Sequence, residues 1–253
     1  MLVCGTTAAS QGAKIIDPTL GNRLLAGLPR VERQALLAHA QLVTLTAPSQ
    51  LDQGHGVRHA WFPVDCTISL LVPAGRRDAL EIGAVGCEGL FGPQSEAEVD
   101  WFELRGFVQS SGRAWRIESA TLQHLCASQE RLNALLLRYL HVLLVQTARS
   151  VACCRFHSLE QRLARWLLAH GDRAWSQELA VTHDQLAMLL GARRAGVTVA
   201  AGQLEQRGVV GCGRGRIAVL DRAGLLQVAC PCYIQDRQTY EHAMGVPPER
   251  RRY

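Results

Sequence analysis

Four arginines occupy positions from which their side chains could bind a polyanion. Arg193 and Arg194 open a segment of helical periodicity, and Arg214 and Arg216 border a tight glycine-containing turn. A guanidinium donates paired hydrogen bonds to phosphate oxygens or to the edge of a guanine base. The residue types and their grouping therefore predict a surface that binds nucleic acid.

The segment around these arginines, residues 178–220, predicts two helices joined by a short turn. Thr182, with a glutamine three residues later, forms a capping box that opens a helix over residues 183–190. Gly191 supplies the positive φ of a tight turn, and a second helix then runs from Arg193 or Arg194 to Gln206. This order is the plan of a helix-turn-helix.

A predicted β-hairpin follows the second helix directly. Residues 209–212 and 216–220 have the composition of strands, and Gly213, Arg214 and Gly215 form the turn between them. Such a hairpin is a wing, in which arginines contact phosphates while the start of the second helix contacts bases. The alternative is a plain helical subdomain with a solvated arginine face. The expected DNA-binding residues are Thr182, His183, Arg193, Arg194, Ala195, Thr198, Arg214 and Arg216.

Thiols and one imidazole flank this module on both sides. Cys153, Cys154 and His157 precede it, and Cys230 and Cys232 follow it. These residue types suit zinc, and the alternative is a set of buried thiols beside a helix-start histidine. We assign no metal and no cofactor, while the sequence leaves open whether this group binds a metal.

A second histidine pair offers a rival hypothesis. His55 and His59 could approach each other within a β-roll, as in a cupin-like metal-dependent enzyme with a helical dimerisation tail. The neighbouring glutamate of a cupin site is missing, so a polar turn is favoured. No Ser-His-Asp order, phosphate loop or paired carboxylates occur, and the sequence predicts no enzyme.

The elements that must position these residues belong to a chain of 253 residues with two unlike halves. Residues 1–122 hold 10 basic and 12 acidic side chains, whereas residues 123–253 hold 17 basic and 10 acidic ones. A slightly acidic half joined to a basic half suggests a sensor attached to a module that meets a polyanion. No apolar run is long enough for a membrane helix, and no signal peptide is evident, so we expect a cytoplasmic protein without membrane contact.

The front half is predicted to be mainly β. One or two short helices are expected over residues 22–28 and 29–40, because their leucines recur at helical spacing. Short strand-like runs follow, with glycine, proline and aspartate between them; this pattern is typical of a sandwich, barrel or jelly roll. The expected strands are residues 42–46, 59–62, 67–72, 80–85, 101–109 and 114–117.

One long helix is predicted over residues 128–152, where neither glycine nor proline occurs. Its apolar positions recur at spacings of four, three and four, which favours a coiled-coil contact in a parallel dimer over a purely intradomain core helix. The expected dimer interface consists of Leu132, Leu136, Tyr139, Leu143 and Gln146.

The order of these parts resembles the Crp/Fnr family of bacterial transcription regulators. The resemblance rests on NRLLAGLP, HAWFPVDCTISLL and EIGAVGCEGLFG in the front half, and on CRFHSLEQRLARWLL with the winged segment behind it. It implies an α+β fold with an N-terminal cyclic-nucleotide-binding-like β-roll, which is a jelly roll, then a long dimerisation helix and a C-terminal winged helix-turn-helix. The corresponding domains are residues 20–127, 128–152 and 153–235.

The resemblance also implies partners and an effector loop. A homodimer would bind an inverted repeat in double-stranded DNA, with RNA polymerase as a further candidate partner and an unknown small molecule as effector. Gly86, Glu88 and Gly89 match the family's effector-binding loop. Residues 93–103 carry four acidic residues and lack the arginine that holds a cyclic phosphate in cyclic-AMP-responsive members. We therefore expect that cyclic AMP does not bind.

Overall fold

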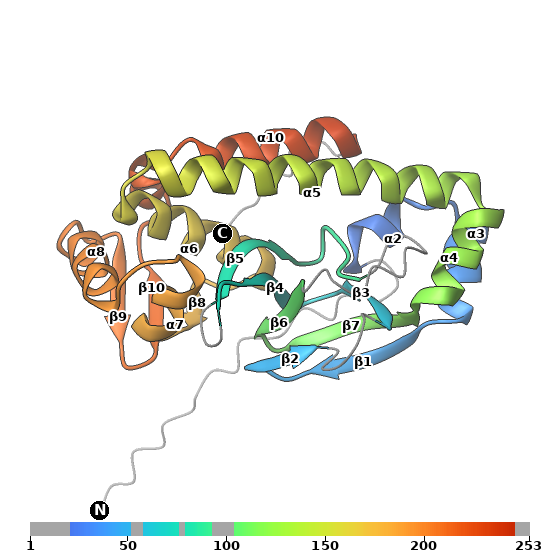
Figure 1. Ribbon diagram of the computed structural model, residues 1–253, viewed down its shortest axis with the longest axis horizontal. Coiled ribbons are helices and arrows are strands. Elements are labelled where there is room, and N and C mark those ends of the chain that lie inside the picture. Colours follow the sequence, from blue (N-terminus) through green and yellow to red (C-terminus); the bar gives the residue numbers. More distant parts are fainter. Residues whose placement is uncertain (1–20, 52–57, 76–78, 93–103, 246–253) are drawn as a thin grey trace, which may run out of the picture.

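The computed structural model describes residues 21–51, 58–75, 79–92 and 104–245 (Figure 1). A β-rich half and a largely helical half lie side by side, and one long helix runs past both of them (Figure 1). This arrangement confirms the predicted α+β fold.

Two antiparallel sheets form the β-rich half. The predicted strands are confirmed within the described residues, with shifts at their ends, while residues 101–103 of one prediction lie outside those residues and β2 (Ser49–Leu51) was not predicted. The strands are β1 (Gln41–Leu45), β2 (Ser49–Leu51), β3 (His59–Pro63), β4 (Thr67–Pro73), β5 (Ala79–Val85), β6 (Arg105–Ser110) and β7 (Gly112–Glu118). One sheet has the order β1-β7-β3, and the other has the order β2-β6-β4-β5. Leu45 and Trp61 from the first sheet share a buried core with Ile68 and Val108 from the second, so the two sheets close on each other as a roll.

Three short helices cover the roll: α2 (Arg23–Gly27), α3 (Arg30–Ala38) and α4 (Ser119–Ser128). The fully buried Asn22 fixes the first of them. Its side-chain oxygen accepts hydrogen bonds from the backbone of Leu24 and Leu25, and its amide donates to the carbonyls of Pro63 and Gly89. One side chain thus caps the helix and ties it to the roll.

The long helix α5 (Glu130–Phe156) has 27 residues and is therefore about 40 Å long. It continues past the predicted end at residue 152, because nothing before His157, which has extended backbone, interrupts its hydrogen bonding. The predicted boundary between the second and third domains therefore falls inside one helix. Neither α5 nor any other helix in the described parts of the chain combines the length and apolarity needed to cross a membrane.

The helical half carries a three-stranded sheet of order β8-β10-β9. Its elements are α6 (Leu159–Ala174), β8 (Glu178–Ala180), α7 (His183–Leu189), α8 (Arg194–Gln206), β9 (Val210–Gly213), β10 (Arg216–Val219) and α9 (Arg222–Val228). Leu163, Leu186, Val197 and Leu204 are fully buried in its core, as are the apolar residues around them. This half therefore has an apolar core distinct from that of the roll.

The last helix, α10 (Cys232–Met244), lies beside α5 and was not predicted (Figure 1). The helix ends at Met244, and Gly245 follows it with a φ of +63°. Asp236 on this helix forms ion pairs with Arg149 and Arg165, and the Tyr240 hydroxyl donates to the Glu88 carbonyl. These polar contacts attach α10 to the rest of the chain. The helix has few apolar residues and they show no clear periodicity, so the sequence did not predict it.

Candidate nucleic-acid interface

The first helix of the predicted helix-turn-helix begins at a capping box, as expected. The Thr182 hydroxyl accepts a hydrogen bond from the Gln185 backbone N–H at 3.2 Å, and the Gln185 side chain accepts one from the Thr182 backbone N–H at 2.8 Å. After α7, Gly191 has a φ of +57°, which a residue without a Cβ adopts readily. The chain therefore turns sharply and enters α8 at Arg194.

Helix α8 is buried on one side and exposed on the other. Val197, Ala201 and Leu204 are almost completely buried in the core, whereas Arg194, Ala195 and Thr198 are exposed. Val199 lies on the exposed side with 61% of its surface accessible. A small or branched apolar side chain at the front of such a helix suits contact with a thymine methyl group.

The predicted wing is a hairpin of β9 and β10 with a two-residue turn. Arg214 and Gly215 form that turn, and Gly215 has a φ of +72°. Strand β8 pairs with the other side of β10, where Arg216 lies opposite Ala180. This third strand was missed, since three residues show no period in a sequence.

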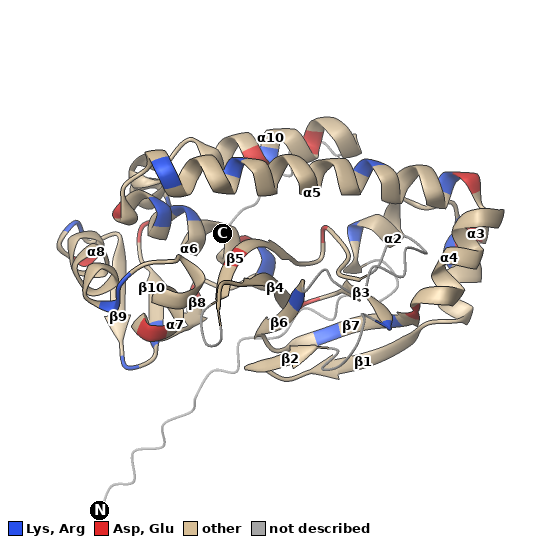
Figure 2. Cartoon of the chain, in the orientation of Figure 1, with Lys and Arg blue, Asp and Glu red and all other residues tan. Residues whose placement is uncertain are grey.

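Contacts among three elements bring the expected DNA-binding residues into one surface. A Cβ built on Gly215 at the wing tip would lie 3.9 Å from Thr182 Cγ2 at the start of α7. Nδ1 of His183 lies 3.0 Å from Oγ1 of Thr198 on α8. Basic residues appear at the hairpin tip and beside α8 in Figure 2. The wing tip, the start of α7 and the front of α8 therefore face the same side.

Two arginines of this surface hold exposed acidic partners that the sequence did not reveal. Arg194 Nε lies 3.1 Å from Asp184 Oδ1, and Arg216 pairs with Glu178 at 3.3 Å. Exposed ion pairs contribute at most about 1 kcal/mol. Both guanidinium groups can therefore exchange these partners for phosphate or base oxygens at little cost.

Comparison with known proteins assigns this half of the chain to a family. Residues 161–228 match the Crp-like helix-turn-helix domain family. The helical half therefore contains a Crp-like helix-turn-helix domain. The match does not extend to the histidine pair of the rival cupin-like hypothesis: His55 lies outside the described residues, and His59 lies in β3 against Trp61.

Solved structures share the Crp/Fnr fold over most of their length. FixK2 from Bradyrhizobium japonicum matches with a TM-score of 0.63 and 14% identity, over 76% of this chain and 98% of that one. The c-di-GMP-responsive global regulator CLP from Xanthomonas campestris gives 0.62 and 17%, over 76% and 99%. A Crp/Fnr-family regulator from Thermus thermophilus gives 0.58 and 21%, over 75% and 98%. Comparison with curated protein sequences finds no match.

The expected effector loop contacts other parts of the chain. Glu88 accepts a hydrogen bond from Arg173 of α6 at 2.7 Å and another from the Gly86 backbone at 3.1 Å. A Cβ on Gly86 would lie 2.7 Å from Arg173, and one on Gly89 would overlap the Tyr139 hydroxyl. Arg173 and Tyr139 therefore occupy the space around this loop. The acidic segment 93–103 lies outside the described residues.

Three residues of the predicted dimer interface on α5 are buried within the chain itself. Leu132, Leu136 and Tyr139 are at most 5% exposed and belong to the core that α5 shares with the roll and its helices. Leu143 and Gln146 are half-buried, and the Gln146 amide donates to the Asp236 carbonyl of α10. A different stripe faces outward: Leu137, Leu144 and Val151 are 57%, 68% and 68% exposed.

Four of the five candidate zinc ligands come together, and one does not. Cys153, His157, Cys230 and Cys232 form a compact group, whereas the neighbouring Cys154 is exposed and lies beside Arg162. A hydrogen bond between the thiols of Cys230 and Cys153, with the guanidinium of Arg165 close by, lowers the pKa of Cys153 to about 4. The thiolate is the form of cysteine that binds metals.

Proposed function

We propose that this Crp/Fnr regulator binds an inverted-repeat operator as a homodimer, with α8 in the major groove and the wing on the phosphates. The observation that carries the proposal is the single surface formed by the wing tip, the start of α7 and the exposed side of α8. Its basic side chains supply sequence-independent attraction to DNA, and its helix supplies contacts to base edges.

Each residue of this surface has a distinct proposed role. Arg194, at the first position of α8, donates paired hydrogen bonds to guanine O6 and N7. Thr198 and Ala195, exposed on the same helix, offer methyl groups to thymine. Arg214 and Arg216 on the wing, together with Arg193 before α8, bind phosphates. Thr182 and His183 place the start of α7 against the DNA backbone.

The homodimer is proposed to form through the outward stripe of α5. Leu137, Leu144 and Val151 are seven residues apart, and His141 and Ala148 lie between them at coiled-coil spacing. A seven-residue apolar repeat packs against its two-fold mate in a left-handed coiled coil. The pairing orients two copies of α8 toward successive major-groove segments on one face of the DNA. The roll, the helix and the winged half thereby act as sensor, dimerisation and DNA-binding domains.

An effector is proposed to act from the pocket between the two halves rather than in the manner of cyclic AMP. Glu88 lines this pocket together with Arg173 of α6 and Tyr240 of α10. A ligand there would contact both the roll and the DNA-binding half and so bias their relative position. Isothermal calorimetry with cyclic AMP and cyclic GMP should show no binding, and micromolar affinity for either would contradict this part. Contact with RNA polymerase remains a prediction.

Selection from a random pool of DNA duplexes tests the proposed function directly. The full chain should enrich an inverted repeat whose half-sites are separated by about one helical turn, 10–10.5 base pairs. A variant lacking the basic surface, Arg194→Ala with Arg214→Ala and Arg216→Ala, should enrich nothing. Enrichment of a non-repeating sequence, or none by the wild-type chain, would overturn the proposal.

A further inference from the structure

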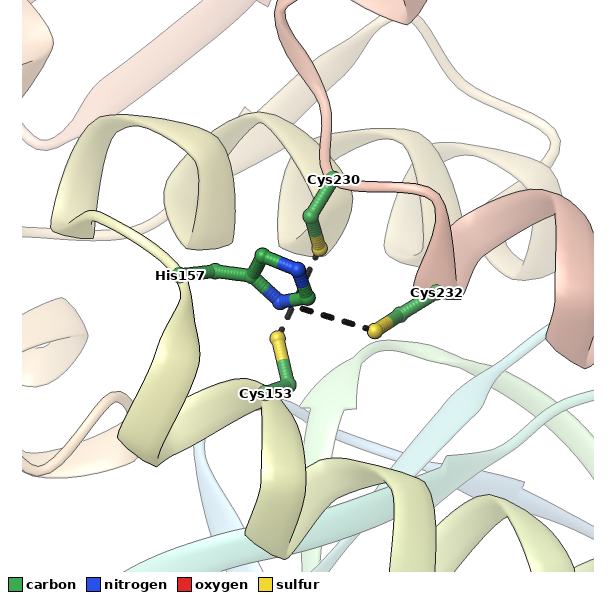
Figure 3. A group of neighbouring side chains, drawn as sticks. All are labelled: Cys153, His157, Cys230 and Cys232. Carbon is green, nitrogen blue, oxygen red and sulfur yellow. Dashed lines mark hydrogen bonds between the residues drawn. The ribbon is translucent and has the colours of Figure 1, made fainter.

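Three cysteines and one histidine from two distant segments point toward one another beside the end of α5 (Figure 3). Cys153 and His157 lie about one turn apart where α5 ends, and Cys230 and Cys232 flank the proline that precedes α10. The four ligand atoms, one from each side chain, all lie within 4.8 Å of one another. Sulfur and imidazole nitrogen form the donor set typical of zinc.

The spacing of these atoms is that of four donors around one ion. Cys153 Sγ lies 3.5 Å from Cys230 Sγ, and Cys232 Sγ lies 3.7 Å from His157 Nδ1. With Zn–S bonds of about 2.3 Å and Zn–N bonds of about 2.0 Å, tetrahedral angles place two sulfurs about 3.8 Å apart and a sulfur and a nitrogen about 3.5 Å apart. A disulfide would need about 2.05 Å. An iron–sulfur cluster spreads its cysteines over different iron atoms, so four mutually close donors fit a single ion better.

The surroundings of the group suit a bound cation. Cys153 and Cys230 are 1% exposed and Cys232 is 4% exposed, and the three form a buried cluster separate from the apolar cores. Three thiolates and one Zn²⁺ sum to a single negative charge. Arg165, whose charge acts on Cys153, and Arg149 both pair with Asp236, so these three groups together carry one positive charge that offsets the charge of the site. The site is therefore balanced electrostatically as well as geometrically.

We propose that Cys153, His157, Cys230 and Cys232 bind one Zn²⁺ ion as a closed structural site. Four protein ligands leave no position for water or substrate, so the ion has a structural role. Two ligands belong to the end of α5 and two to the segment before α10. The zinc ion therefore ties the last helix to the long helix at the point where the chain enters α6, and it holds the DNA-binding half at a fixed angle to α5.

Metal analysis of the full chain tests the proposal. Protein purified without chelators from cells grown with added zinc should carry about one zinc ion per chain. After chelation and reconstitution with Co²⁺, tetrahedral thiolate ligation should give intense visible bands and a sulfur-to-cobalt charge-transfer band. Absence of zinc together with absence of these bands would overturn the proposal. Stoichiometric iron, or a Cys153–Cys230 disulfide in freshly purified protein, would overturn it as well.

Variants locate the ion within the chain. Cys232→Ser and His157→Gln should each lower the zinc content and weaken Co²⁺ binding by at least tenfold. Cys154→Ser removes the adjacent exposed thiol outside the group and should bind zinc like the wild type. If a variant fails to fold, alkylation of the wild-type chain decides. Chelation should expose three additional reactive thiols, identified by mass spectrometry as Cys153, Cys230 and Cys232, and an unchanged set would contradict the assignment.

Discussion

Arg194 and Arg216 are both exposed and both hold an acidic partner, yet they face DNA in different ways. Arg194 is the first residue of α8, and the exposed residues that follow it in the first turns, Ala195, Thr198 and Val199, are short, so its guanidinium can reach down to a base edge. Arg216 opens a wing strand and pairs across the sheet edge with Glu178. We propose that from this position it binds the phosphate backbone, which carries no sequence information directly.

Replacing Arg194 with alanine should reduce the preference for the operator over random DNA, while the affinity for random DNA should change little. Loss of a paired contact to guanine removes about 1–3 kcal/mol of discrimination, or about 5- to 150-fold, at one base pair of each half-site. Competition between the selected operator and random duplex DNA measures this change. Arg207→Ala, at the far end of α8 beside Glu160, is the matched control. Equal weakening on both DNAs would show that α8 does not read bases through Arg194.

Replacing Arg216 with alanine should weaken binding to every sequence alike. One phosphate contact fewer per protomer lowers the slope of log affinity against log salt by about 0.9 for each protomer. Titrations of operator and random DNA at several salt concentrations give that slope. A loss confined to the operator, with the salt slope unchanged, would contradict the assignment of the wing to phosphates.

At the scale of elements, the periodicity of α5 predicted the helix but not which of its faces is buried. The sequence predicted one long helix with an apolar stripe, and the structure confirms the helix. The spacing of Leu132, Leu136 and Tyr139 is as good a coiled-coil pattern as that of Leu137 and Leu144. Which apolar stripe of α5 faces the roll depends on how α2 and α4 pack against α5. This packing is a tertiary interaction, so it cannot be predicted from the sequence of α5 alone.

Glutamates at Leu137 and Leu144 should separate the dimer and leave the fold intact. Both side chains are exposed in the single chain, so a charge at either position has little effect on the stability of the monomer. In the proposed coiled coil, the same charges would lie in the apolar interface between the two copies of α5. Sedimentation equilibrium should show monomers with an unchanged denaturant midpoint. Leu136→Ala is the counterpart on the buried stripe: it should stay dimeric and lose about 2–5 kcal/mol of unfolding free energy. If the double variant were still a dimer, the proposed interface on α5 would be contradicted.

Some of the other elements are specified by their own residues and were predicted, whereas others depend on distant partners and were missed. The capping box at Thr182 and the glycine at Gly191 are local signals, so α7 and the turn were predicted closely. Strands β2 and β8 have three residues each and exist because β6 and β10 offer them partners. Helix α10 depends on Asp236 meeting Arg149 and Arg165 from helices 70 or more residues earlier in the chain. Such long-range pairing produces no periodic pattern in the sequence, so it could not be predicted.

At the scale of the whole molecule, buried polar contacts join the roll to the half that contains the helix-turn-helix. Glu81 of β5 accepts hydrogen bonds from Ser69 and from Trp166 of α6, and it lies 3.0 Å from the His170 ring nitrogen. Burial alone raises the pKa of Glu81, but the charge of His170 and these hydrogen bonds outweigh burial and lower it. The environment of Glu81 at this junction thus favours its charged form, and Glu88 and Arg173 form a second ion pair between the halves, with 2.7 Å between Oε1 and Nε.

This junction should weaken in acid. Because the folded pKa of Glu81 lies below its unfolded value, its contribution is present above the ordinary carboxyl pKa of about 4.3 and is lost as the pH falls through the depressed value. The difference in unfolding free energy between wild type and Glu81→Gln should therefore shrink below about pH 4. Urea unfolding of both proteins between about pH 3 and pH 6 measures it. A difference that stays constant through the acid range would contradict this role.

The mass of the complex on DNA tests most directly the claim that two chains read one inverted repeat. Native mass spectrometry should find two chains on the selected duplex. When one half-site is scrambled, the affinity of the dimer for the duplex should fall toward that for random DNA. The Leu137→Glu, Leu144→Glu variant should bind the intact operator only weakly, without the two-chain complex. One chain per duplex at full affinity, with the second half-site irrelevant, would contradict the account.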